Sequence, residues 1–295
     1  MRPSLIASLA LACLAAAGPG APAWSAGRAA PKVWSQDWSV GARPVVRVRV
    51  DDAHVRIHRG PDARVSTRVE YELRTRGLVF GATSPAVVFE RSGNTIRIQA
   101  RDARGVGVVG VLDERFTVDV TVPREVELEI ESGDGAIDCD SLTGRFQLET
   151  SDGAVRAHGL KGDITVATRD GRVILDDLDG SLRVRTSDGR LTTAGRFDAL
   201  DVRSSDGRLD VHARKGSKVK LPWSLESRDG AVSLRIPVDL SALLDARTRD
   251  GALRVNLPIP ARGRERNALV GHLNDGGPPL RIRTQDGSIT LGLSE

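Results

Sequence analysis

Polar and apolar residues alternate along most of this chain, and from Asp134 onward the alternation recurs with a fixed period. The dipeptide Asp-Gly marks this period, first at five positions spaced 18 residues apart: Asp134, Asp152, Asp170, Asp188 and Asp206. Three more copies follow at spacings of 23, 21 and 36 residues: Asp229, Asp250 and Asp286. A repeat of this length predicts a solenoid, in which each unit packs only against its neighbours.

Within each repeat, aliphatic residues stand two positions apart, as in a strand with one buried face. In the second copy, Val155 follows the Asp-Gly turn, and Ile164 and Val166 follow a Leu-Lys-Gly turn. Two short strands are therefore expected, over about 153–158 and 163–168. Stacked coils would place equivalent residues about 4.8 Å apart and fill a dry interior with Leu, Val and Ile.

The later repeats are less regular. Insertions at 215–223 and 237–244, the first containing Trp223, are expected to form loops. The 36-residue interval before Asp286 equals two periods, so one coil is expected to lack its Asp-Gly. Residues 258–279 are rich in Pro, Gly and Arg and predict an atypical coil before a final strand pair, 280–284 and 288–293.

The N-terminal half lacks the Asp-Gly marker but keeps the alternation of strands. Residues 45–130 are expected to form irregular β-coils or a small sheet that caps the solenoid of residues 131–295, in a register that the sequence does not determine. Residues 24–44 are expected to be a flexible leader. The predicted fold class is all-β, a solenoid with coils of about 18 residues.

Residues 1–23 are expected to be a secretory signal, because Arg2 precedes an apolar run over 5–17 and small residues follow. The mature protein is then expected in the periplasm, at the cell surface or outside the cell. Cys13 offers the alternative of a lipid anchor. No later stretch approaches the roughly 18 apolar residues of a membrane span, so none is expected after signal cleavage.

Composition and charge pattern indicate the kind of surface and core that this chain forms. The chain carries 43 basic and 39 acidic residues in an interleaved pattern, which predicts a mixed solvated surface and no nucleic-acid footprint. Aromatic residues make up only 3%, so the core must come from Val, Leu, Ile and Ala. Divergent sequence at both ends of the solenoid indicates a capped monomer, because an exposed end would be an unpaired sheet edge.

The aspartate row is the sharpest candidate site. In-register coils would line up the five carboxylates of Asp134, Asp152, Asp170, Asp188 and Asp206, and such a row could hold Ca²⁺. The alternative is turn chemistry, with Asp bonding its own backbone and Gly adopting positive φ. Arginines beside the turns favour this alternative, since they would neutralise the row: Arg169, Arg172, Arg190, Arg208, Arg228 and Arg249. We therefore expect no metal site and no cofactor.

The remaining reactive side chains give no catalytic site. Cys139 falls in an inward column with Ala157 and is expected to be buried. The histidines show no ligand spacing, and His158 and His212 are expected at exposed positions. A polysaccharide-acting β-helix enzyme is the alternative class, but the regular coils leave no room for long loops and contain one tryptophan, Trp223. A self-assembling envelope scaffold is a further alternative.

Several motifs also point to a family. A Val-Thr-Val-Pro element at 120–123 precedes serial Ser/Thr-x-Asp-Gly repeats, and the tail has characteristic runs at 271–277 and 280–289. Over roughly residues 40–293 the chain resembles the bacterial putative-adhesin family of β-strand-repeat envelope proteins, a family of unknown function. The resemblance implies a right-handed single-stranded β-helix at the surface or in the periplasm, without assigned catalytic residues. A non-catalytic binding or structural module is therefore expected, with a cell-surface glycan or an envelope protein as partner.

Overall fold

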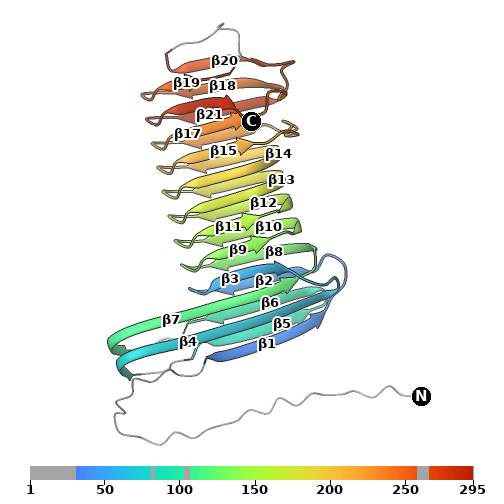
Figure 1. The fold of residues 1–295 in the computed structure, drawn as a ribbon, viewed down its shortest axis with the longest axis vertical. Helices are drawn as coiled ribbons and strands as arrows, with labels where there is room; N and C mark the ends of the chain where they lie inside the picture. Colours follow the sequence, from blue (N-terminus) through green and yellow to red (C-terminus); the bar gives the residue numbers. More distant parts are fainter. Residues whose placement is uncertain (1–30, 81–83, 103–106, 258–265, 295) are drawn as a thin grey trace, which may run out of the picture.

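The computed structural model describes residues 31–80, 84–102, 107–257 and 266–294. Its described part contains strands and no helix, and the strands join into one 22-stranded sheet wound into an elongated stack (Figure 1). The predicted signal at 1–23 and Cys13 lie outside the described residues. Within the described ranges, no helix has the length and apolar character to cross a membrane.

The strands fall into three groups along the chain. The N-terminal group comprises β1 (Lys32–Ser39), β2 (Val45–Val50), β3 (His54–Arg59), β4 (Arg64–Phe80), β5 (Ala86–Ser92), β6 (Thr95–Arg101) and β7 (Gly107–Val122). The central group comprises β8 (Glu125–Ser132), β9 (Ile137–Asp140), β10 (Thr143–Thr150), β11 (Val155–His158), β12 (Lys161–Thr168), β13 (Val173–Thr186), β14 (Leu191–Ser204) and β15 (Leu209–Ala213). The C-terminal group comprises β16 (Trp223–Ser227), β17 (Val232–Ile236), β18 (Ala242–Thr248), β19 (Leu253–Val255), β20 (Ala268–Leu273), β21 (Pro279–Thr284) and β22 (Ile289–Leu293).

In the central group, each coil pairs in parallel with the coil that follows it in sequence. Ile164 of β12 lies opposite Phe146 of β10 on one side and Leu182 of β13 on the other, each 18 residues away. Val155 of β11 lies opposite Val173 in the same way. The predicted columns of equivalent residues are therefore present.

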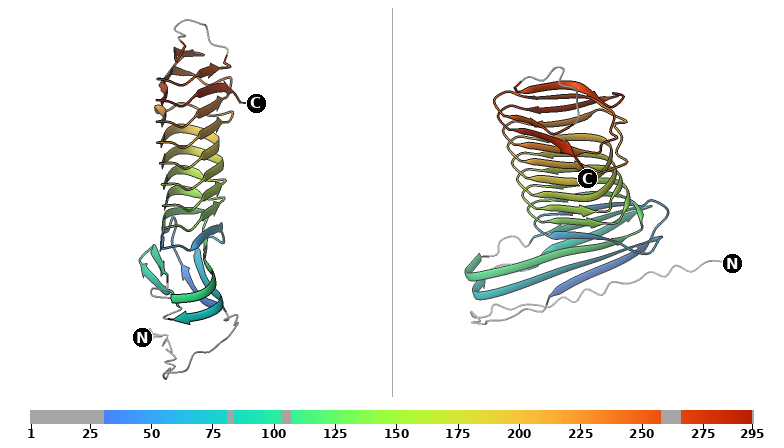
Figure 2. Two further views of the ribbon diagram at one scale, coloured as in Figure 1. Left: turned by 90° about the vertical axis from the view of Figure 1, so that its left-hand side faces the viewer. Right: turned by 45° about the horizontal axis from the view of Figure 1, so that its top comes forward.

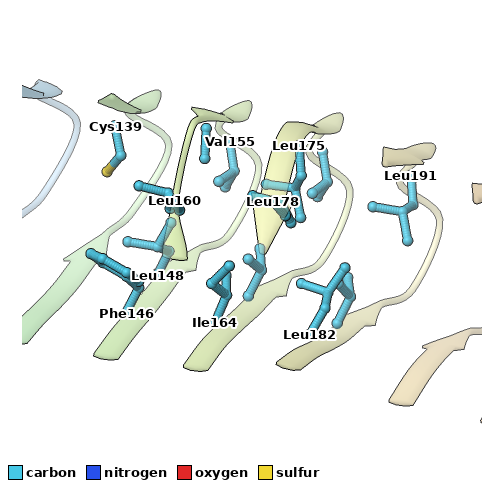
Figure 3. Close-up of a cluster of buried hydrophobic side chains, with 14 of the residues drawn as sticks. Cys139, Phe146, Leu148, Val155, Leu160, Ile164, Leu175, Leu178, Leu182 and Leu191 are labelled. Carbon is cyan, nitrogen blue, oxygen red and sulfur yellow. The ribbon is translucent and has the colours of Figure 1, made fainter. Parts of the chain in front are cut away.

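The stack encloses one continuous apolar core. Side chains such as Phe146, Leu148 and Val155 are fully buried and point inward from the two faces of each coil (Figure 3). Leu160 of the turn between the two strands is also fully buried and closes the narrow side of the coil. Because the strand alternation puts every second side chain inside, the remaining side chains form two outward faces. We call the outward face of β2, β6, β8, β10, β12, β16, β18, β21 and the second halves of β13 and β14 face A, and the face of the other coil strands face B.

At the N-terminal end, the order of coils in space differs from their order in the chain. Strands β2 and β3 form one coil, and this coil lies between the β6/β7 coil and the β8/β9 coil (Figure 1). Antiparallel strands then complete the end, with β5 on β6 and β4 on β7. Strand β1 pairs with β4 over eight residues from Lys32 to Ser39. The flexible leader predicted for 24–44 is therefore wrong over β1, whose tryptophans Trp34 and Trp38 pack against the core.

The C-terminal end shows the same exchange of order. The last coil, β21/β22, lies between β16/β17 and β18/β19 (Figures 1 and 2). The 36 residues between Asp250 and Asp286 therefore do not form two stacked coils. Their described part contains β20, which runs antiparallel to β18 and covers it.

Two predicted loops also prove to be partly strand. Trp223 begins β16 and is fully buried, with its ring in an edge contact to Phe197 at 6.4 Å between centroids. Leu244 lies in β18 and is likewise buried. Both residues face the core because the coil must keep its inward columns filled even where its turns are longer.

Candidate functional site

The Asp-Gly turns stack along one edge of the molecule, as predicted. The backbone N–H of Asp170 donates to the carbonyl of Ser151 at 3.1 Å, and that of Asp188 donates to Arg169 at 3.0 Å. Each turn is also held by a hydroxyl, since Thr168 accepts the N–H of Gly171 at 3.1 Å and donates to the Ser151 carbonyl at 3.0 Å. The Ser or Thr two residues before each Asp therefore stabilises the turn. The Ser/Thr-x-Asp-Gly motif of the sequence therefore includes a side chain that holds the turn.

The Asp-Gly glycines are required by close approach of neighbouring coils. A Cβ atom on Gly171 would lie 2.0 Å from the carbonyl oxygen of Gly153. These two glycines are absent from the positive-φ set, which instead contains Gly144 and Gly162 of the other turn. The positive φ expected at Asp-Gly is therefore wrong, and the physical reason for glycine is the space between stacked backbones.

The carboxylate row is longer than the sequence predicted. The N–H of Asp134 donates to the Asp52 carboxylate at 3.3 Å, which adds Asp52 to the N-terminal end of the row. At the other end, the N–H of Asp286 donates to the carbonyl of Arg228 at 3.0 Å, and that of Asp250 donates to the carbonyl of Gln285 at 2.9 Å. Asp286 thus lies between Asp229 and Asp250 in the row. The period of the sequence does not predict that Asp286 precedes Asp250 along the row. This order arises because the last coil, β21/β22, lies between β16/β17 and β18/β19.

Crowding of carboxylates perturbs several members of the row. Loss of solvent raises the pKa of Asp188 above its usual value, and Asp206 and Asp170 raise it further. The pKa of Asp229 is raised by desolvation and by its neighbours in the same way. Burial, a hydrogen bond to Asp52 and nearby carboxylates raise the pKa of Asp102 to about 7. Like charges at this spacing favour the protonated form.

The arginines beside the turns neutralise much less of this row than expected. Among the described residues, the one ion pair made by a carboxylate of the row joins Arg169 to Asp152 at 3.8 Å. Arg208 pairs instead with Asp210 at 2.9 Å, on the outward side of β15. The prediction of a neutralised row is therefore wrong for the other carboxylates, and for Arg208 the reason is its ion pair with Asp210.

The carboxylates of the row are spread along the stack and do not gather around one point. Within the described ranges, no group of three or more His, Cys, Asp or Glu side chains is placed to hold a metal ion. The five carboxylates first considered for Ca²⁺, Asp134, Asp152, Asp170, Asp188 and Asp206, follow one another in a line, one per coil. Calcium usually takes six to eight oxygen ligands around one point.

Cysteine and histidine occupy structural positions. Cys139 is a free, buried cysteine opposite Ala157, as predicted, and burial raises the pKa of its thiol well above the usual range. A thiol in this state is a poor nucleophile. His158 is exposed as predicted, whereas His212 is half-buried on β15. His54 lies 2.6 Å from the Asp138 carboxylate across neighbouring coils. The two residues are 84 positions apart, so this contact could not be predicted from the sequence.

Face A divides into two regions of different charge pairing. Near the N-terminal end, arginines and glutamates pair across neighbouring strands: Arg47 with Glu129, Arg49 with Glu131 and Arg97 with Glu90, at 2.6 to 3.0 Å. Arg43, just before β2, pairs with Glu125 at 2.9 Å. Farther along the stack, Arg145 of β10 and Arg185 of β13 are exposed and have no ion-pair partner among the described residues. The middle of face A therefore offers guanidinium groups that are free to bind anions.

A surface hollow of about 540 Å³ lies in this middle region, over β12, β13 and β14. We call it the arginine-bordered hollow, and its defining side chains are Arg145, Asp163, Arg183, Ala199, Asp201, Arg203 and Leu221. Arg183 and Arg203 share the carboxylate of Asp201 at 3.3 and 3.2 Å, and Arg203 also lies 3.9 Å from the Glu226 carboxylate. The lining itself holds three arginines and two aspartates, so cations outnumber anions among the lining residues. A second hollow of about 330 Å³ is lined by the residues that follow those of the first hollow along β12 and β13, and it includes Arg169 and Arg185.

Comparison with solved structures finds chains of low identity. A putative lipid binding protein from Parabacteroides distasonis matches with 14% identity and a TM-score of 0.43, covering 89% of this chain and 97% of that one. A putative adhesin from Bacteroides fragilis has 10% identity and a TM-score of 0.40, with coverage of 89% and 97%. A putative adhesin from Parabacteroides merdae has 12% identity and a TM-score of 0.40, with coverage of 90% and 97%.

No curated protein matches the chain. A family model does, and it spans nearly the whole of the stack described above, from the first coil strand to the last. This match confirms the family resemblance indicated by the repeats. Since the model described as Toastrack DUF4097 matches residues 46–292, the chain belongs to that family.

Proposed function

We propose that this protein is an exported, non-catalytic binding module of the bacterial cell envelope, built as a right-handed solenoid. The observation that carries the proposal is the pair of outward faces, on which side chains recur at the fixed spacing of hydrogen-bonded strands. A fully buried apolar core holds these faces rigid. A rigid surface of this kind suits many weak contacts with an extended partner, which add up through multivalency.

Two features support export. The apolar run over 5–17 after Arg2 has the form of a secretory signal. The free thiol of Cys139 is buried, so the protein would tolerate an oxidising compartment without forming a disulfide. Expression of the full chain with a C-terminal epitope, followed by cell fractionation, tests this part. Recovery of a shortened chain from the periplasm or surface is expected, whereas a full-length chain in the cytosol would contradict export.

Binding without chemistry is tested on the full chain with envelope polysaccharides and whole cells. Retention on cells or glycans is expected, with no release of reducing ends or unsaturated uronates. Product formation would show that the protein is an enzyme, and the His54–Asp138 contact would then be the first pair to substitute. Concentration-dependent filaments in the absence of any ligand would favour a scaffold instead.

A further inference from the structure

We infer that the arginine-bordered hollow on face A binds an acidic glycan chain, a polymer that carries both carboxylate and hydroxyl groups. This inference rests on the proposed binding function and names the chemistry of its ligand. Its starting point is the pairing of charges on face A. Arg47 and Arg49 are satisfied by glutamates of the next strand, whereas Arg145 and Arg185 are not.

The hollow exists because small outward side chains follow one another in neighbouring coils. On β12, β13 and β14, the outward position that holds Arg145 on β10 is taken by Asp163, Ser181 and Ala199 in turn. The exposed Leu221, which belongs to the longer turn before β16, forms part of its lining. Long side chains would otherwise cover this part of the sheet.

The lining offers two kinds of polar contact. Guanidinium groups of Arg145, Arg183 and Arg203 can donate charge-assisted hydrogen bonds to a carboxylate. Asp163 is exposed and has no hydrogen bond or ion pair among the described residues, so its carboxylate can accept from a hydroxyl. A uronic-acid chain presents both groups on each sugar.

The combination of guanidinium donors and a carboxylate acceptor in one hollow favours an acidic glycan over nucleic acid. A phosphate backbone has few donors for Asp163 and Asp201, which would repel it. The hollow also lacks an aromatic ring among its lining residues, and base recognition on single strands relies on such stacking. The adjoining hollow with Arg169 and Arg185 lies on the same strands and would extend the site along a linear chain.

The test measures binding of the full chain to polygalacturonate, with neutral dextran and duplex DNA as the other probes. Tighter binding to polygalacturonate than to either is expected, weakening as salt is raised. The double variant R145Q/R185Q should bind about tenfold more weakly per guanidinium removed. The variant A199E, which places a carboxylate in the hollow, should weaken binding to a similar extent.

The matched control is Arg190→Gln. Arg190 is exposed and without an ion pair among the described residues, but it lies beside the Asp-Gly turn, away from the hollow. Its substitution should leave binding within twofold of the original, and melting temperatures should confirm that all variants fold. Equal binding by R145Q/R185Q, equal loss in the control, or preference for dextran or DNA would overturn the inference. In each of these cases, retention on cells would leave the proposed function standing.

Discussion

The middle of the stack and its two ends follow different rules of order. From β8 to β15, chain order and spatial order coincide, and each coil rests on its predecessor. At the N-terminal end the first coil, β2/β3, lies nearer the middle of the stack than the second coil, β6/β7. At the C-terminal end the last coil, β21/β22, lies nearer the middle than the coil before it, β18/β19. The coils β2/β3 and β21/β22 are thereby each held between two other coils.

This difference has an energetic consequence. A coil that ended the stack in simple order would have one unpaired edge on each strand, and a terminal coil can fray without disturbing its neighbours. An inserted coil pairs on both edges, so its release would expose the coils on either side as well. Antiparallel strands β1, β4, β5 and β20 then cover the outermost layers. The first and last coils of the chain are thus coupled to neighbours on both edges, as the middle coils are.

Removal of the last coil should have the largest effect. Deletion of 279–295 removes four fully buried aliphatic side chains, Leu280, Ile282, Ile289 and Leu291. At about 1.5–3 kcal/mol each, this loss is about 6 kcal/mol or more, comparable to the stability of a whole domain. Hydrogen exchange should then show loss of protection in β16–β19.

The control for this deletion removes a coil from the middle. Deletion of 155–172, one period of 18 residues, joins Ala154 to Val173 and restores the column positions. This shortened protein should fold and melt cooperatively. If both deletions cause the same loss of protection, the inserted coil has no special role in the end of the stack.

Substitution of a stacking glycine should have the next largest effect. Gly171→Ala would place a Cβ atom 2.0 Å from the Gly153 carbonyl oxygen and force two coils apart. Overpacking of this kind costs about 1–3 kcal/mol of unfolding free energy, measured by denaturant titration. Gly292→Ala is the control, because nothing lies within 4 Å of its added Cβ atom. An equal change in the two variants would contradict the close-stacking explanation.

The N-terminal end should respond to pH through Asp102. Its folded-state pKa of about 7 exceeds the usual value of 3.8, so the native protein binds a proton that the unfolded chain lacks. Stability contributed by this group therefore rises as pH falls from above 7 toward 4. Asp102→Asn should stabilise the protein at pH 8 by about 1 kcal/mol after solvent screening, and this gain should vanish near pH 4.

Thermal melts of the two proteins from pH 4 to pH 8 measure this difference. Asp62→Asn, on the exposed turn before β4, is the control for loss of one negative charge. A gain at pH 8 that persists unchanged at pH 4 would show that protonation of Asp102 is not its cause.

Calcium should have the smallest effect. The carboxylates from Asp134 to Asp206 form a line with one oxygen donor group per coil, which cannot surround an ion. Millimolar calcium should therefore change the melting temperature by less than about 1 °C, since tight binding would stabilise by mass action. A rise of several degrees that is lost in Asp170→Asn would establish the row as a calcium site.

Much of the regular stack was predictable because its information is local. The 18-residue period and the spacing of two within each repeat identified the inward columns, including Cys139 opposite Ala157. The aspartate row followed from the same period. The pairing of the row with arginines could not be predicted in the same way. Arg208 stands beside the turn in sequence, but its side chain forms an ion pair with Asp210 of β15.

The sequence by itself determined the composition of each coil: which residues point inward and where the turns fall. The tertiary structure alone decided which coil stacks on which at the two ends, and with it the contacts Arg47–Glu129 and His54–Asp138 and the place of Asp286. The physical reason is that every coil presents nearly the same apolar columns to its neighbours. Local pattern therefore permits several stacking orders, and only closure of both sheet edges at once selects one.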